Sequence, residues 1–168
     1  MLNLWRSDVA AYLSSLGQPY REDCTNRDTR FTRNRIRHEL LPRLEADYGP
    51  KVRESLVRLA GLAADAERVI DEQADRLVEQ ALVDAGPQRL TFDRRKLAQA
   101  DRHLVRQAMV QVWRRQAWPL AAMGYAEWDL LADMVLDANL PAMKQTLPGA
   151  VSAQCTTDQL VIERAAGA

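Results

Sequence analysis

The chain has 168 residues, which is enough for one or two small domains with a hydrophobic core. Hydrophobic residues make up 47% of the sequence and charged residues 27%, a composition typical of a folded globular protein that excludes an intrinsically disordered one. The 23 Lys and Arg residues balance the 23 Asp and Glu residues, but residues 86–120 hold eight basic and only two acidic side chains, an asymmetry that suits binding to a polyanion.

Metal and membrane functions are not indicated. Cys24 and Cys155 lie far apart with no CxxC spacing, and only His38 and His103 could join them, so neither a metal site nor a disulfide framework is predicted. No leader peptide is recognisable at the N-terminus, and no apolar run approaches the roughly 20 residues that cross a bilayer. We expect a cytoplasmic protein with no membrane partner.

The first helix is predicted between Ser7, which can cap it, and about Leu16, with Gly17 as its C-terminal stop. Pro19 prevents its continuation, and residues 20–30 are predicted to form an extended loop. Four side chains of this loop can bond neighbouring backbone N–H groups, so we expect the loop to be rigid. They are Asp23, Thr25, Asn26 and Asp28.

A second helix is predicted over residues 33–46, with Thr32 as its N-cap and a kink or restart at Pro42, which lacks a backbone donor. At 100° per residue, its apolar side chains form a broad stripe that should be buried. The stripe consists of Ile36, Leu40, Leu41 and Leu44.

Arg33 and Arg37 fall in the middle of this stripe, which predicts two arginines on the buried side of the helix. An unpaired buried guanidinium is costly, so both need anionic partners. Asp23 or Asp28 could fold back and pair with them. Alternatively, the two arginines, with Asn34 beside them, could line a cleft that binds phosphate, which suits the planar donor fork of arginine.

The surrounding sequence holds a long motif in three parts. They are Asp23-Cys24-Thr25-Asn26-Arg27-Asp28, Phe31-Thr32-Arg33-Asn34-Arg35-Ile36-Arg37 and Leu40-Leu41-Pro42. This succession resembles the segment that closes the N-terminal ATPase domain of tRNA(Ile)-lysidine synthetases. The family pattern there is an acidic-x-Ser/Thr-Asn loop, an aromatic residue, Arg-Asn-x-Ile/Val-Arg and Leu-Leu-Pro.

The resemblance implies that residues 1–48 are the end of an ATPase domain and residues 49–168 a helical tRNA-binding domain. The parent enzyme would be an ATP-dependent carbon–nitrogen ligase. It activates the wobble cytidine of an isoleucine tRNA with ATP and magnesium, and joins lysine to it to form lysidine. By resemblance, Arg33, Asn34 and Arg37 would face the active-site cleft, and Asp23 and Asn26 would support the loop. No catalytic residue is assigned.

One departure from the family is large. The family binds ATP phosphates with a Ser-Gly-Gly-x-Asp-Ser loop, whereas the seven glycines of this chain are scattered singly. We therefore expect a fragment that lacks the phosphate loop, binds no cofactor and is inactive alone.

A long amphipathic helix is predicted from Lys51 to about Asp84, with an apolar stripe at steps of three and four and otherwise mostly acidic faces. Such a stripe could be the seam of a homodimer. A helical protein-interaction module or a DNA-binding module therefore remains the alternative to the ligase interpretation.

A basic region follows the long helix. Asp93 can cap a short turn and Asp101 a helix to about Ala117, and their cations form the densest basic patch of the chain. The patch residues are Arg94, Arg95, Lys96, Arg102 and Arg106. They could contact the backbone phosphates of tRNA, or they could pair with the acidic long helix.

The remaining sequence predicts a helix over residues 125–137 and two strands, over residues 151–155 and 159–163. The predicted fold is mainly α, with a long amphipathic helix and a small C-terminal β-hairpin.

Overall fold

The computed structural model describes residues 6–19, 24–137 and 142–165. The chain forms two compact units, residues 1–60 and residues 61–168. The boundary lies inside the long helix α4, whereas the domain boundary proposed from the sequence lies before it, at residues 48 and 49.

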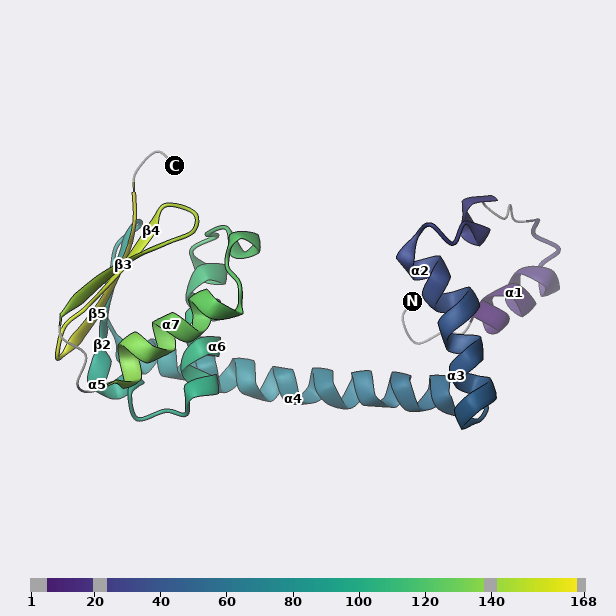
Figure 1. Ribbon diagram of the computed structural model, residues 1–168, viewed down its shortest axis with the longest axis horizontal. Helices are drawn as coiled ribbons and strands as arrows, with labels where there is room; N and C mark the ends of the chain where they lie inside the picture. Colours follow the sequence, from purple (N-terminus) through teal and green to yellow (C-terminus); the bar gives the residue numbers. More distant parts are fainter. Residues whose placement is uncertain (1–5, 20–23, 138–141, 166–168) are drawn as a thin grey trace. The chain divides into compact units, whose positions relative to one another are not determined.

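The first unit is helical (Figure 1). Its elements before the long helix are α1 (Arg6–Ser15), η1 (Cys24–Arg27), α2 (Thr32–Arg35), η2 (Ile36–Leu40) and α3 (Leu41–Tyr48). After α1, Gly17 has φ +62°, the left-handed conformation expected of a C-terminal stop. The predicted N-cap at Thr32 is wrong, because α2 begins at Thr32 and its cap residue, Phe31, makes no side-chain cap bond.

The second predicted helix changes its winding before its proline, as the sequence led us to expect. Residues 36–40 form a π-helical turn, and α3 starts at Leu41 with Pro42 in its first turn. Proline lacks the N–H for an internal α-helical bond, and its ring clashes with the carbonyl of the residue four positions earlier, His38. The wider π-turn relieves both constraints.

Helix α4 (Val52–Ala81) is a single helix of 30 residues, close to the predicted span (Figure 1). Its last predicted residues belong instead to strand β1 (Leu82–Ala85), which a turn at Gly86 and Pro87 joins to β2 (Arg89–Asp93).

The second unit is a five-stranded antiparallel sheet in the order β1-β2-β5-β4-β3, with helices on one face (Figure 1). Its later strands are β3 (Met143–Leu147), β4 (Val151–Cys155) and β5 (Gln159–Arg164). Its helices, inserted between β2 and β3, are α5 (Arg94–Leu97), α6 (Arg102–Arg115), the short η3 (Leu120–Ala122) and α7 (Tyr125–Leu136). The predicted hairpin is therefore present as β4 and β5, but within a larger sheet.

The core of the second unit lies between the sheet and α6 and α7. Alternate strand residues such as Phe92, Leu160 and Ile162 are fully buried there. Trp113 of α6 is fully buried and makes edge-to-face contacts with Trp118 and Trp128, with ring centroids 5.0 and 5.2 Å apart. The prediction of a mainly α protein with a terminal β element is confirmed.

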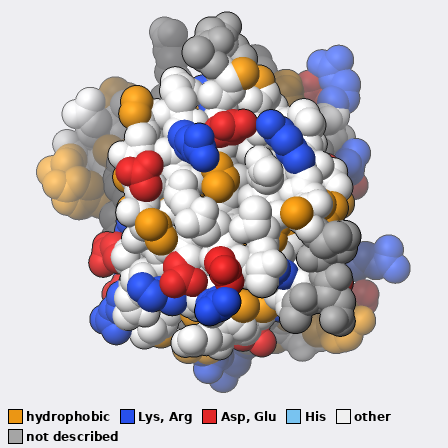
Figure 2. All heavy atoms as spheres, turned by 90° about the vertical axis from the view of Figure 1, so that its left-hand side faces the viewer, with side chains coloured by type: hydrophobic (Ala, Val, Ile, Leu, Met, Phe, Trp, Pro, Cys, Tyr) orange, Lys and Arg blue, Asp and Glu red, His pale blue; other side chains and the backbone are white. Residues whose placement is uncertain are grey.

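Figure 2 shows the opposite face of the sheet, on which basic and acidic side chains alternate instead of gathering by sign. One such pair is Lys144 with Glu163, whose Nζ and Oε1 atoms are 3.2 Å apart. Glu163 also accepts a bond from Ser152, and the bond to Lys144 lowers its pKa. The described residues of this face therefore offer no concentrated positive charge to a polyanion.

Candidate functional site

The loop of residues 24–31 is a compact turn that ends at Phe31, directly before α2. Its backbone closes through bonds from the Asp28 N–H to the Thr25 carbonyl (3.1 Å) and from the Phe31 N–H to the Asp28 carbonyl (3.2 Å). The Asp28 carboxylate accepts the Arg30 backbone N–H at 3.0 Å and holds the Arg30 guanidinium at 2.7 Å. This bond lowers the pKa of Asp28 and raises the pKa of Arg30. Asp28 therefore pairs with Arg30, not with Arg33 or Arg37.

Asn34 fastens this loop to the helix. Its side chain is fully buried, and its Nδ2 donates to the carbonyls of Thr25 (2.7 Å) and Asp28 (3.0 Å). His38, four residues later on the same side of the helix, bonds through Nε2 to the Asn26 carbonyl at 2.9 Å. We call the bonds that Asn34 and His38 make to the loop the loop clamp.

The loop clamp corrects one site prediction and refines another. Asn34 faces the loop, so it does not line a cleft with Arg33 and Arg37. Asn26 takes part in holding the loop, but through its main-chain carbonyl. Asp23, the other predicted support residue, lies outside the described residues.

Arg33, Arg35 and Arg37, which we call the arginine row, are exposed in this structure. The prediction that Arg33 and Arg37 are buried is wrong, because the stripe they share is itself open: Ile36 is 42% and Leu40 48% exposed. The helix turns its Asn34 side toward the loop instead. No hydrogen bond or ion pair joins any of the three guanidinium groups to another described residue.

Two members of the arginine row, Arg33 and Arg35, each line a surface hollow. The hollow at Arg33 is also lined by Thr25, Phe31 and Thr32, and the one at Arg35 by Thr32, Ile36, Glu39, Leu40 and Arg43. Phe31 is 52% exposed in the first hollow. An exposed aromatic ring beside a guanidinium that pairs with no described residue can contact both the base and the phosphate of a nucleotide.

Replacing Asn34 with Ala should open the loop, because the carbonyls of Thr25 and Asp28 would lose the donor that ties them to the helix and keep only their backbone bonds within the loop. We expect a cost of about 1–3 kcal/mol to local stability. Faster hydrogen exchange at the amides of Asp28 and Phe31 would measure it. Thr32→Ala, an exposed position on the same helix, is the matched control and should leave both amides protected. Unchanged exchange in the Asn34 variant would contradict this role.

The basic side chains of the second region, unlike the arginine row, have partners within the protein. Arg94 is the clearest case. Its side chain is only 4% exposed. Its Nε donates to the Val135 carbonyl (3.0 Å), its Nη1 to the Thr156 carbonyl (3.1 Å) and its Nη2 to the Asp137 carbonyl. The predicted tRNA contact of Arg94 stays untested, but its side chain is buried and each of its three guanidinium nitrogens already donates to a carbonyl inside the protein.

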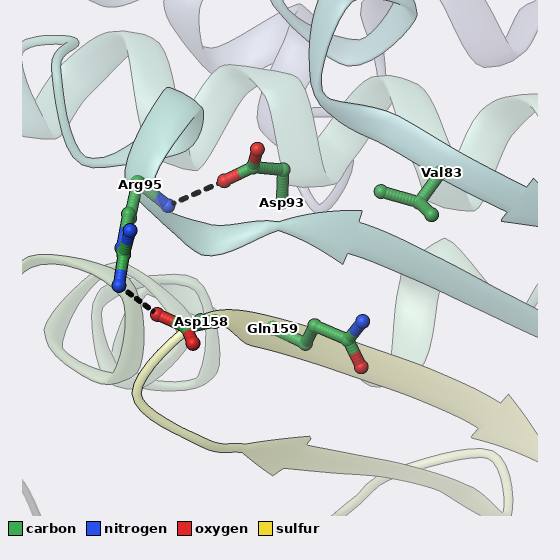
Figure 3. A pocket seen from close by; sticks show the side chains of 5 residues that line it. All are labelled: Val83, Asp93, Arg95, Asp158 and Gln159. Atoms are coloured by element: carbon green, nitrogen blue, oxygen red, sulfur yellow. Dashed lines mark hydrogen bonds and ion pairs between the residues drawn. The ribbon is translucent and has the colours of Figure 1, made fainter.

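Arg95 and Lys96 are exposed but have partners. Figure 3 shows the Arg95 guanidinium directed at Asp158, with 2.5 Å between Nη2 and Oδ1, while its backbone N–H bonds to Asp93. The Lys96 Nζ donates to the Gln80 carbonyl at 3.0 Å. Asp93 caps α5 as predicted, accepting bonds from the N–H groups of both residues.

Arg102 and Arg106 bind the acidic side of α7. Arg102 pairs with Asp133 and with Asp129 at 2.9 Å, and these bonds raise its pKa. Arg106 bonds to Asp129 at 3.1 Å and lies over the Tyr125 ring, 4.9 Å from its centroid.

The neighbouring arginines of α6 bind the acidic long helix, as the alternative interpretation of this region anticipated. Arg114 pairs with Asp71 at 3.4 Å and Arg115 with Asp75 at 2.9 Å. A polyanion at this surface would have to displace carboxylates, whereas no described carboxylate pairs with the arginine row.

The described residues contain no group of three or more His, Cys, Asp or Glu side chains that could bind a metal ion. Within the same residues, no helix is long and apolar enough to span a membrane.

A family model for the PP-loop domain matches residues 1–44. The tRNA(Ile)-lysidine synthase of Rhodopirellula baltica is 28% identical over 155 residues, which cover 82% of this chain and 38% of that protein. The tRNA(Ile)-lysidine synthase of Thermosynechococcus vestitus is 31% identical over 69% of this chain and 33% of its own length. That of Geobacter sulfurreducens is 44% identical over 49% of this chain and 16% of its own length.

The chain thus spans less than half the length of these curated relatives. The PP-loop match includes the whole loop clamp and the arginine row. Together with relatives that match up to 82% of its length, this places the chain in the tRNA(Ile)-lysidine synthase family.

Proposed function

We propose that this chain works in the cytoplasm as part of a tRNA(Ile)-lysidine synthase, the ligase that uses ATP to join lysine to an isoleucine tRNA. The observation that carries the proposal is the arginine row: three exposed guanidinium groups, paired with no described residue, on a helix that the loop clamp fixes in place. Arg33, Arg35 and Arg37 bind phosphate groups of the tRNA or of ATP. Arginine suits this role because its donors match phosphate oxygens.

The loop clamp supports this role through preorganisation. A cation that is already held in position loses less conformational freedom when it binds a phosphate. Asn34 and His38 fix the backbone from which the three arginines project, so they position the row without contacting the ligand.

The described residues supply cations that suit the phosphates of ATP, but no cradle for those phosphates and no ligand cluster for a magnesium ion. They include no carboxylate cluster that could bind the metal, and the sequence has no glycine-rich loop whose N–H groups could surround the phosphates. ATP chemistry therefore needs residues beyond those in this chain. The second basic region remains a secondary candidate for tRNA contact, through Arg95, Lys96, Arg102 and Arg106.

The purified 168-residue chain should bind tRNA, with an affinity that falls steeply as salt increases, and should not consume ATP. The first result follows from phosphate contacts that release counterions and the second from the missing phosphate cradle. Fluorescence anisotropy with labelled tRNA, at several salt concentrations, and an assay for AMP release would measure both. Salt-independent binding would contradict the proposed phosphate contacts. ATP turnover would contradict the expectation that this chain alone cannot use ATP.

A further inference from the structure

The helix that carries the arginine row contains one turn of wider winding. Between α2 and α3, residues 36–40 are π-helical, and the Leu41 N–H donates to the carbonyl of Ile36, five residues earlier. An unbroken α-helix would join Leu41 to Arg37, four residues earlier. A π-turn holds about 4.4 residues instead of 3.6, so the chain advances by roughly 82° per residue instead of 100°. The π-turn therefore changes which residues of the helix lie in line.

The wider turn aligns two sides of this helix. In an unbroken α-helix, residues four positions apart differ by about 40° around the axis. Across the π-turn, the same spacing places Arg37 within about 15° of Arg33, and His38 within about 15° of Asn34. The second alignment agrees with the contacts, because Asn34 and His38 both bond to carbonyls of the same short loop. The first gives two exposed arginines of the row a common direction from the axis.

A hollow on another side of the helix supports this winding. Arg35 and Arg43 both line it, although they are eight residues apart in the sequence. Eight α-helical steps would separate them by about 80° around the axis. Five steps through the π-turn and three α-helical steps leave them within about 20° of each other.

Pro42 is the residue that keeps this turn from closing as an ordinary α-helix. It lies in the first turn of α3, directly after the π-turn. Having no N–H, it cannot donate to the carbonyl of His38, and in α-helical geometry its ring would clash with that carbonyl. We propose that Pro42 is a positioning residue: it maintains the π-turn and thereby aligns the arginines that bind phosphate.

This role of Pro42 rests on the proposed phosphate contacts of the arginine row. Arg33 and Arg37 are about 6 Å apart along the axis, and when they share a direction they suit neighbouring phosphates of one nucleic-acid strand. Without the π-turn, Arg37 would rotate by about 40°, which moves a guanidinium about 8 Å from the axis by roughly 5 Å. Arginine is a flexible side chain and recovers part of this displacement, so we expect a moderate loss of affinity.

The winding itself is tested by Pro42→Ala. Alanine supplies the missing N–H and has the highest helix propensity, so the variant should form an unbroken α-helix. NMR couplings across hydrogen bonds in the isotope-labelled chain identify the acceptor of the Leu41 N–H. We expect the Ile36 carbonyl in the unsubstituted chain and the Arg37 carbonyl in the variant. The melting temperature of the variant should be no lower, which separates a change of winding from a loss of folding.

The effect on binding is measured with labelled tRNA. At about 0.1 M salt, Pro42→Ala should weaken binding by about fivefold, the effect of about one lost phosphate contact. The slope of log K against log salt should fall by about 0.7–0.9. Pro50→Ala is the matched control, because Pro50 is also exposed but lies between α3 and α4, outside the π-turn. It should change the affinity by less than about twofold.

A positioning role also predicts losses that do not add. Arg37→Ala alone should weaken binding by about fivefold. In the Pro42→Ala chain, the same substitution should weaken binding by less than about twofold further, because Arg37 has already lost its contact. Arg33→Ala should keep its full effect in both chains, since Arg33 lies before the π-turn.

Three results would overturn the proposal. They are a Leu41 N–H that stays bonded to Ile36 in the Pro42→Ala chain, equal affinities of the Pro42→Ala and Pro50→Ala chains, and fully additive losses for Pro42→Ala and Arg37→Ala. Failure of the proposed function looks different, because Arg33→Ala and Arg37→Ala would then both leave tRNA binding unchanged. The acceptor of the Leu41 N–H would still decide whether Pro42 maintains the π-turn.

Discussion

Changing Arg33, Arg35 and Arg37 together to Ala should weaken tRNA binding by about 100-fold at about 0.1 M salt, taking about 1 kcal/mol for each lost phosphate contact. The folded structure should not suffer, because the three side chains are exposed and bond to no described residue. The loss should be similar for different tRNAs, since contacts to the phosphate backbone carry no sequence information.

The salt dependence separates a direct contact from a general loss of charge. Each lost contact should reduce the slope of log K against log salt by about 0.7–0.9, so the triple variant should lose about two to three units of slope. The matched control removes three exposed arginines of α4: Arg58, Arg68 and Arg76. It changes the net charge equally but should keep most of the slope. Equal losses in the two triple variants would show that the arginine row has no special role.

Local signals in the sequence predicted much of the fold. Asp93 and Asp101 cap the helices they precede because a carboxylate needs only the next two or three N–H groups as partners. The β4–β5 hairpin was predicted because the alternation of its strands and its short turn are visible within a few residues of sequence. The extent of the sheet was missed, because β1 and β3 each form a hairpin with the next strand, and only the long-range pairing of β2 with β5 joins these hairpins into one sheet.

The site was harder to predict. Helical periodicity gives the direction of each side chain around the helix axis, but not which side of the helix the rest of the protein covers. The wheel grouped Arg33 and Arg37 with the apolar residues, but the side that packs on the loop carries Asn34 and His38. Their acceptors are main-chain carbonyls, which every residue possesses and which no sequence pattern marks. The one available signal was the four-residue spacing of two polar side chains next to a loop rich in turn-forming residues.

The burial of Arg94 was not predicted, for a related reason. In sequence it is one member of a basic run with Arg95 and Lys96, and such runs usually lie at the surface. Its acceptors, at Val135, Asp137 and Thr156, are 41 to 62 residues away. Two of them are carbonyls at the C-terminal end of α7, which lack partners within the helix and attract positive charge. The arginine therefore caps a distant helix, which only the tertiary structure reveals.

Replacing Arg94 with Ala should lower the free energy of unfolding of the second unit by about 3–5 kcal/mol, a large part of the total stability of a small domain. The variant would leave three carbonyls without their donor in a site where little water enters, and it would open a cavity. It would also detach the end of α7 from the turn between β4 and β5. Arg94→Lys should recover only part of the loss, because one ammonium group cannot reproduce the planar fork of donors.

Chemical denaturation followed by tryptophan fluorescence would measure the loss, since Trp113, Trp118 and Trp128 pack together in the core of this unit. The neighbouring substitution Arg95→Ala is the control. Its side chain is 74% exposed and the one ion pair it forms with the described residues, to Asp158, lies at the surface, so the substitution should cost less than about 1 kcal/mol. Similar losses at the two positions would mean that the buried bonds of Arg94 contribute little. A large difference would show that Arg94, but not the adjacent Arg95, stabilises the second unit, whichever surface binds the tRNA.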